Sequence, residues 1–169
     1  YQNAIGIFST SSSSSTNGTL AATATTGTNS SNKYYGNTIS NVQYGIYTIC
    51  EPITATITEA GNEFGSASSG TGNTITFGTS TAADLGLTRF TGTPISGIIM
   101  RNGAGNAAIN NTVTSNSLTL AVAGITVSNG STPTGVTYTT TLSNNTVTLT
   151  NTGTTAMTGI DFGHGISTG

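Results

Sequence analysis

The sequence predicts an all-β protein, a parallel β-helix in which the short strands of successive turns stack on one another. Three observations lead to this fold class. The tripeptide Asn-Thr-Ile/Val recurs four times, a Gly-Ile pair recurs along the chain, and the composition favours strands. There are 15 Ile, 6 Val and 38 Thr against only 7 Leu, and β-branched residues pack well on a pleated sheet. No stretch has the sustained 3.6-residue apolar period of a helix.

The tripeptide begins at residues 37, 73, 111 and 145, so successive copies are separated by 36, 38 and 34 residues. In a solenoid each copy would start the same strand of a new turn, about 4.8 Å from the previous copy. Its Ile or Val would face the interior, and its Asn could stack on the Asn of the next turn as a ladder of side-chain amides. The residues predicted for this role are Asn37, Ile39, Asn73, Ile75, Asn111, Val113, Asn145 and Val147.

The second repeated element is Gly-Ile, preceded by a short stretch of polar and apolar residues. Glycine adopts positive φ without a Cβ clash, so we expect it at a sharp corner just before the next strand. The stretch QNAIGIFST aligns with NVQYGIYTI in this way. The separation between the Asn of the tripeptide and the following Gly varies from copy to copy, so the loops differ in length while the strands repeat. The corner glycines predicted are Gly45, Gly97, Gly124 and Gly159.

Residues 1–169 are expected to form a single solenoid segment that is part of a longer chain. The sequence shows neither a secretory signal peptide nor an amphipathic terminal cap, which fits an internal segment. Residues 9–32, which contain five consecutive serines, interrupt the pattern. We predict that they form an exposed Ser/Thr-rich loop insertion.

A β-sandwich is the alternative fold. From residue 118 the stretches LTLAV, GVTYTTTL and NTVTLTN alternate apolar and polar residues, as half-buried antiparallel strands do. Ser143-Asn144-Asn145 would then be a hairpin turn, and the N-terminal AIGIF would be a strand donated to a neighbouring filament subunit. The repeat extends from residue 6 to residue 160, however, and a single sandwich does not require one.

The scarcity of charge excludes several classes of protein. Eight residues are charged, three of them basic, and the net charge is −2. Three cations do not neutralise a row of phosphates, so we expect no nucleic-acid partner. There is no polybasic patch and no apolar stretch long enough to span a bilayer, so we expect no insertion into a membrane. The one cysteine, Cys50, excludes a disulfide framework and a thiolate zinc site. No metal or cofactor is predicted.

The string GHGIS at residues 163–167 resembles the motif that supplies a histidine in polygalacturonases, which are β-helix enzymes. That family hydrolyses its substrate with paired carboxylic acids. Its Asn-Thr-Asp, Asp-Asp and Arg-Ile-Lys elements are missing here, and Asp161 is the only carboxylate side chain that follows Asp84 in the sequence. We therefore expect His164 at a solenoid corner and predict no catalytic residue. A degenerate polysaccharide-acting enzyme is the alternative.

The other ionisable residues give no stronger signal. Glu51, Glu59 and Glu63 lie close together in the sequence, but a strand-like ITATIT interrupts them. Calcium needs six to eight oxygen ligands, so a solvated loop is expected here, with weak calcium binding as the alternative. Arg89 and Arg101 have no visible acidic partners and are expected at the surface.

Stretches over most of the chain resemble the right-handed parallel β-helix repeats of long secreted, adhesin-like surface proteins from Bacteroidota. They are NKYYGNTISNVQYGIYTI, GNTITFGTSTAADLG, SGIIMRNGAG and NNTVTLTNTGTTAMTGIDFGHG. The resemblance implies an extracellular, structural or adhesive solenoid, and the missing acids lead us to expect no enzymatic activity. It also implies export across the outer membrane by type IX secretion and retention at the cell surface.

The expected partners are neighbouring repeats of the same chain, surface glycans, and an outer-membrane secretion or anchoring system. Hydroxyl- and amide-rich faces can hydrogen-bond carbohydrate, and Tyr34, Tyr35, Tyr44 and Tyr47 are candidate platforms on which sugar rings could stack. Packing between strands is the alternative role for these tyrosines. A filament subunit assembled by strand donation is the alternative function.

Overall fold

A computed structural model describes residues 5–10, 28–49, 60–78, 95–101, 103–115, 122–128, 139–150, 154 and 156–162. Every regular element in these ranges is a β-strand, and none of the described residues belongs to a helix able to cross a membrane. The strands are β1 (Ile5–Thr10), β2 (Lys33–Tyr34), β3 (Thr38–Val42), β4 (Tyr44–Ile49), β5 (Glu63–Phe64), β6 (Thr74–Phe77), β7 (Ile95–Arg101), β8 (Asn106–Ile109), β9 (Thr112–Thr114), β10 (Val122–Ser128), β11 (Thr140–Ser143), β12 (Thr146–Thr148) and β13 (Met157–Phe162).

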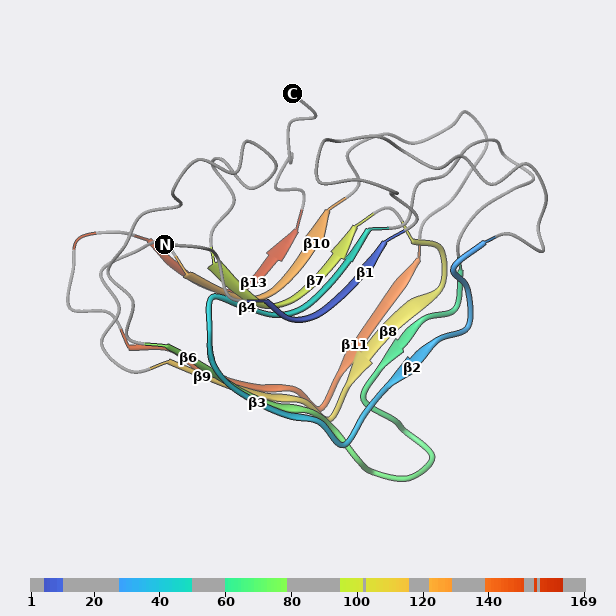
Figure 1. The fold of residues 1–169 in the computed structure, drawn as a ribbon, viewed down its shortest axis with the longest axis horizontal. Helices are drawn as coiled ribbons and strands as arrows, with labels where there is room; N and C mark the ends of the chain where they lie inside the picture. Colours follow the sequence, from blue (N-terminus) through green and yellow to red (C-terminus); the bar gives the residue numbers. More distant parts are fainter. Residues whose placement is uncertain are drawn as a thin grey trace.

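The strands form three parallel sheets, which the chain visits in the same order on every turn. Sheet 1 is β1-β4-β7-β10-β13, sheet 2 is β2-β5-β8-β11, and sheet 3 is β3-β6-β9-β12. In Figure 1 the chain runs along β1, down β2 and back along β3, clockwise, while later turns lie farther from the viewer. The coil is therefore right-handed, and the predicted parallel β-helix is confirmed.

The β-sandwich alternative is wrong, because all strand pairs are parallel and successive strands belong to different sheets. Ser143-Asn144-Asn145 is not a hairpin turn. It connects β11 of sheet 2 to β12 of sheet 3, and Asn144 takes a φ of 53° at that corner. The N-terminal strand β1 pairs in parallel with β4 of the same chain. Since β1 extends through residue 10, the first residues of the loop expected over 9–32 belong to a strand, and residues 11–27 lie outside the described ranges.

The four tripeptides lead into the four strands of sheet 3 in register. Their threonines pair in the order Thr38, Thr74, Thr112, Thr146. Their apolar residues pair in the order Ile39, Ile75, Val113, Val147. The first three apolar residues are buried, and Val147 packs against the same core. Side chains of similar shape thus stack from turn to turn along the interior.

The glycines of the Gly-Ile element have a different role from the one expected. Gly45, Gly97, Gly124 and Gly159 lie within β4, β7, β10 and β13, and none of them has positive φ. A Cβ at Gly45 would lie 2.6 Å from Cγ2 of Ile75. At Gly124 it would lie 2.8 Å from Cγ2 of Val147. The expectation of corner glycines is therefore wrong: sheets 1 and 3 approach too closely for a methyl group between them.

In three of the four turns, left-handed corner positions lie immediately before the tripeptide, whereas Gly72, which precedes the tripeptide at residue 73, does not have positive φ. Gly36, Asn110 and Asn144 occupy them, with φ of 70°, 60° and 53°. Glycine and asparagine are the residues that adopt this conformation most readily. In these three turns the sharp corner between sheets 2 and 3 therefore depends on the residue just before the repeated tripeptide.

Sheet 1 is covered on both faces along its central strands. Every residue of β7 and β10 is buried, including the polar Ser96 and Thr126, whose hydroxyls hydrogen-bond each other at 2.9 Å. Sheets 2 and 3 instead alternate between buried and accessible positions. A parallel sheet with two covered faces needs apolar side chains on both, as the stretch ISGIIM in β7 provides.

Candidate functional site

The first candidate site is a ladder of asparagine side chains at the corner between sheets 2 and 3. Nδ2 of Asn37 donates to Oδ1 of Asn73 at 2.9 Å. Asn73 donates in the same way to Asn111, and Asn111 to Asn145, each at 2.8 Å. Each of the three accepting oxygens also receives the backbone N–H of the asparagine one turn earlier, at 3.0–3.2 Å. Every rung therefore carries two hydrogen bonds from one turn to the next.

Each of the last three asparagines of this ladder also donates a side-chain amide hydrogen to a backbone carbonyl. Nδ2 of Asn73 donates to the carbonyl of Tyr34 at 2.8 Å, and Nδ2 of Asn111 donates to that of Phe64 at 2.8 Å. Asn145 reaches the carbonyl of Ala108 at 2.7 Å. Asn73 and Asn111 are buried, so these bonds offset the cost of removing an amide from water. The ladder fixes both the spacing of the turns and the angle of the corner.

A second asparagine ladder, which the sequence analysis missed, runs along the start of sheet 2. Oδ1 of Asn62 accepts the backbone N–H and the side-chain amide of Asn32 at 2.9 and 3.1 Å. Oδ1 of Asn106 accepts the backbone N–H of Asn62 at 3.0 Å. The separations of these residues are 30 and 44, so the column has no regular period in the sequence. The only sequence signal is an Asn at or just before the start of a short strand.

This second ladder stops after three members. The residue paired with Asn106 on the next turn is Thr140, whose side chain has no amide oxygen to accept a hydrogen bond from Asn106. Asn106 is buried, and its Nδ2 has no hydrogen-bond partner among the described residues. A buried unpaired N–H costs about 1–3 kcal/mol, so this end of the second ladder is a weak point of the corner.

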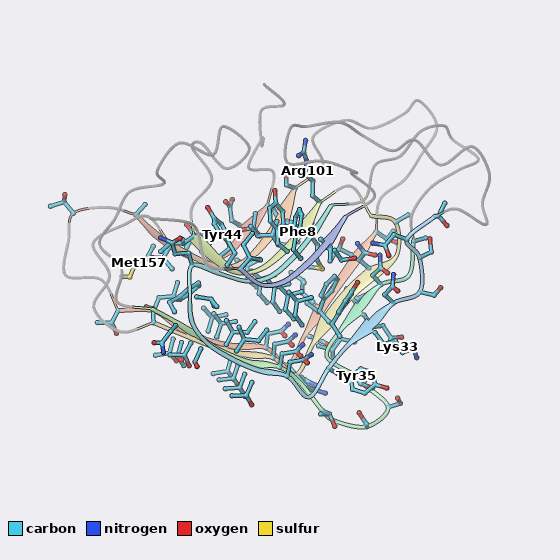
Figure 2. The ribbon with its side chains drawn as sticks, in the orientation of Figure 1. Phe8, Lys33, Tyr35, Tyr44, Arg101 and Met157 are labelled. Carbon is cyan, nitrogen blue, oxygen red and sulfur yellow. The ribbon has the colours of Figure 1, made fainter. Side chains whose placement is uncertain are left out.

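The outer face of sheet 3 carries two columns of hydroxyl side chains, which we call the threonine face. One column consists of Thr38, Thr74, Thr112 and Thr146. The other consists of Ser40, Thr76, Thr114 and Thr148. All eight are exposed or half-buried, and Figure 2 shows short side chains pointing away from the interior along this sheet. The tripeptide thus places one residue in the core and flanks it with two on the surface.

The ionisable side chains described by the structure do not form a reactive centre. Lys33 and Glu63 are paired in adjacent strands, with Nζ and Oε2 3.7 Å apart and both side chains well exposed. Such a pair contributes little to stability. The described ranges contain no group of three His, Cys, Asp or Glu residues placed to hold a metal ion. Cys50, Glu51, Glu59, Arg89 and His164, which the sequence analysis singled out, lie outside those ranges.

Arg101 is not at the surface, and that expectation is wrong. It ends β7 with only 6% of its surface exposed, because it belongs to the sheet that is covered on both faces. Its Nε has no hydrogen-bond partner in the part of the chain that the structure describes. Figure 2 places its side chain on the side of sheet 1 that faces away from sheet 3.

The four candidate tyrosines divide into three kinds. Tyr44 and Tyr47 are fully buried and pack against each other with ring centroids 6.0 Å apart, so a role as platforms for sugars is wrong for these two. Tyr34 is half-buried and stacks on Phe64 at 5.3 Å. Tyr35 is 45% exposed beside the corner, where Figure 2 labels it. Tyr35 is the one whose ring offers open surface.

No protein-family model, curated protein or solved structure matches this chain. The candidate site therefore rests on the geometry of the two ladders and of the faces that they hold in place.

Proposed function

We propose that this chain is a structural and adhesive segment of a long extracellular β-solenoid protein, exported across the outer membrane and retained at the cell surface. The architecture suits a spacer. Each turn contacts only its neighbours and lengthens the rod by about 4.8 Å, so length is gained without a larger core. The low charge and the buried amide ladder allow identical turns to stack without repulsion.

The observation that carries this proposal is the exposure of apolar side chains on β13, the last described strand of sheet 1. Ile160 is 44% exposed and Phe162 is 65% exposed, whereas their register partners Ile125 and Val127 in β10 are buried. A Cβ at Gly159 would meet no described atom within 4 Å, whereas one at Gly124 would clash with Val147. No described strand pairs with the outer edge of β13, and its apolar side chains are exposed where those of β10 are covered. We infer that neighbouring repeats of the same protein are its first partner.

The resemblance of the repeats to adhesin-like surface proteins of Bacteroidota supports a location outside the cell. Surface glycans and an outer-membrane secretion or anchoring system are the further partners that we propose. Among the candidate tyrosines, Tyr35 is the most suitable to stack on a sugar ring, because its ring is accessible beside the Asn37 corner.

The test is mass spectrometry of the protein from its natural source, intact and after trypsin. We expect peptides that continue beyond residues 1 and 169 and contain further Asn-Thr-Ile/Val units. Protease treatment of intact cells should remove these peptides, while a cytoplasmic protein from the same cells should survive as the control. A mature mass near 16.8 kDa would contradict the proposal and would favour the filament subunit instead.

A further inference from the structure

The threonine face has a two-dimensional order. Neighbours within a column are one strand apart, about 4.8 Å, and the two columns are two residues apart along the strand, about 6.6 Å. The buried Ile39, Ile75 and Val113 hold the strands from behind, and the first asparagine ladder fixes the turns beside them. The hydroxyl and methyl groups are therefore presented on a preorganised grid.

Most of the hydroxyls on this grid have no partner within the described residues. Thr76 and Thr114 share a hydrogen bond of 3.2 Å, and Thr114 also lies 3.4 Å from the carbonyl of Ile75. The other six hydroxyls make no hydrogen bond to any residue that the structure describes. Their donors and acceptors are available to the solvent at regular intervals.

The solenoid itself does not require threonine at these positions, as sheet 2 demonstrates. Its outward column, at the same turn-to-turn spacing, reads Lys33, Glu63, Ala107 and Thr141. A basic, an acidic, an apolar and a hydroxyl residue all stack there within one molecule. The uniformity of the threonine face is therefore a property of that face, and strand stacking alone does not explain it.

The chemistry of the face selects its ligand. Its eight residues include no charge and no aromatic ring, so it suits neither an anionic polymer nor a sugar ring that needs a stacking platform. An uncharged solid with a regular lattice of hydrogen-bonding groups is complementary to it. Ice is such a solid, and the spacing between turns, about 4.8 Å, is close to the repeat of oxygen atoms along the a axis of hexagonal ice.

We propose that the threonine face binds ice. The hydroxyls take the place of surface water molecules, and the methyl groups occupy the gaps between them. Each contact is weak, but the grid is rigid, so little conformational entropy is lost when many contacts form at once. Four turns give a small face, and additional turns would enlarge it. This inference goes beyond the role of a spacer and does not depend on it.

The experiment measures inhibition of ice recrystallisation and uptake of the protein into a growing ice hemisphere. We expect the wild-type chain to be enriched in ice and to inhibit recrystallisation at a concentration at least ten times lower than serum albumin. Thr112→Lys, at the middle of the face, should raise the inhibitory concentration at least tenfold. Thr141→Lys places the same side chain on the outer face of sheet 2 and should retain wild-type activity. Thermal unfolding followed by circular dichroism confirms that both variants are folded.

Two further variants keep the test sharp if the lysine disturbs the strand. Thr112→Val keeps the methyl group and Thr112→Ser keeps the hydroxyl, and each should retain a part of the activity that Thr112→Lys loses. Equal activity of wild type and albumin would overturn the proposal, as would equal losses in Thr112→Lys and Thr141→Lys. Binding to microcrystalline cellulose without any effect on ice would also overturn it. None of these outcomes bears on the mass of the natural chain, which tests the spacer role.

Discussion

Sheets 2 and 3 are built by the same coil, from four strands each, and yet they differ in regularity. Sheet 3 begins at a ladder of four asparagines and shows a uniform outer face. Sheet 2 begins at a ladder of three, ends at an amide unpaired among the described residues, and shows an outer column of mixed chemistry. Strands of successive turns can therefore stack with different residues in one outward column, provided that the neighbouring side chains do not repel each other and the backbone hydrogen bonds are made.

The largest effect is expected from breaking the complete ladder at its centre. Asn111→Ala removes the acceptor of the Asn73 side chain and backbone, and it removes the amide that donates to the carbonyl of Phe64 in a buried site. We expect a loss of about 3 kcal/mol in the free energy of unfolding, since each unpaired buried group costs about 1–3 kcal/mol. Urea unfolding measures it. Asn37→Ala, at the half-buried end of the ladder, is the matched control and should cost less than half as much.

The next largest effect is expected from filling the close packing around Gly124 in β10. Gly124→Ala places a methyl group against Val147 and against the carbonyl oxygen of Gly159, so β10 must move away from β12 and from β13. Overpacking of this kind costs about 1–3 kcal/mol, and we expect about 2 kcal/mol by urea unfolding. Gly159→Ala adds the same methyl group to β13, where no described atom lies within 4 Å, and should be close to neutral. Equal losses in the two variants would show that strand propensity, not the close packing around Gly124, is responsible.

A smaller effect is expected from the incomplete ladder of sheet 2. Asn106→Ala removes one acceptor of the backbone N–H of Asn62 and also removes an amide that already lacks a partner among the described residues. The two changes oppose each other, so we expect a loss of about 1 kcal/mol, clearly below that of Asn111→Ala. Equal losses in Asn106→Ala and Asn111→Ala would show that the incomplete ladder contributes as much to stability as the complete one, contrary to this prediction.

The smallest effect is a gain. Thr140→Asn would place an amide oxygen beside Nδ2 of Asn106 and add a fourth member to the second ladder. We expect about 1 kcal/mol of added stability, or a rise in Tm of about 2–4 °C. Thr141→Asn makes the same change on the exposed neighbour and should leave Tm unchanged. A Tm for Thr140→Asn at or below that of Thr141→Asn would contradict the ladder extension.

Much of this fold follows from four short motifs. The second and third residues of Asn-Thr-Ile/Val alternate between surface and core, which is a local consequence of strand geometry, so the inward column of Ile39, Ile75 and Val113 could be placed in advance. The structural role of Gly124 could not be predicted from the sequence in this way. Glycine serves equally at a corner or at a close approach, and the positions of Val147 across the core and of the Gly159 carbonyl beside it decide between them.

The sequence by itself determined the fold class, the residues that begin each strand of sheet 3 and the shortage of charge, because these depend on local preference and on repetition along the chain. Tertiary structure alone decided that Asn32, Asn62 and Asn106 share a column and that Arg101 is buried. Arg101 is buried because sheet 1 is covered on both faces. For the asparagine column the physical reason is the weak dependence of loop-closure entropy on length: doubling a loop costs only about 0.6 kcal/mol. Turns of unequal length can therefore align the same residues in space while their spacing in the sequence conceals it.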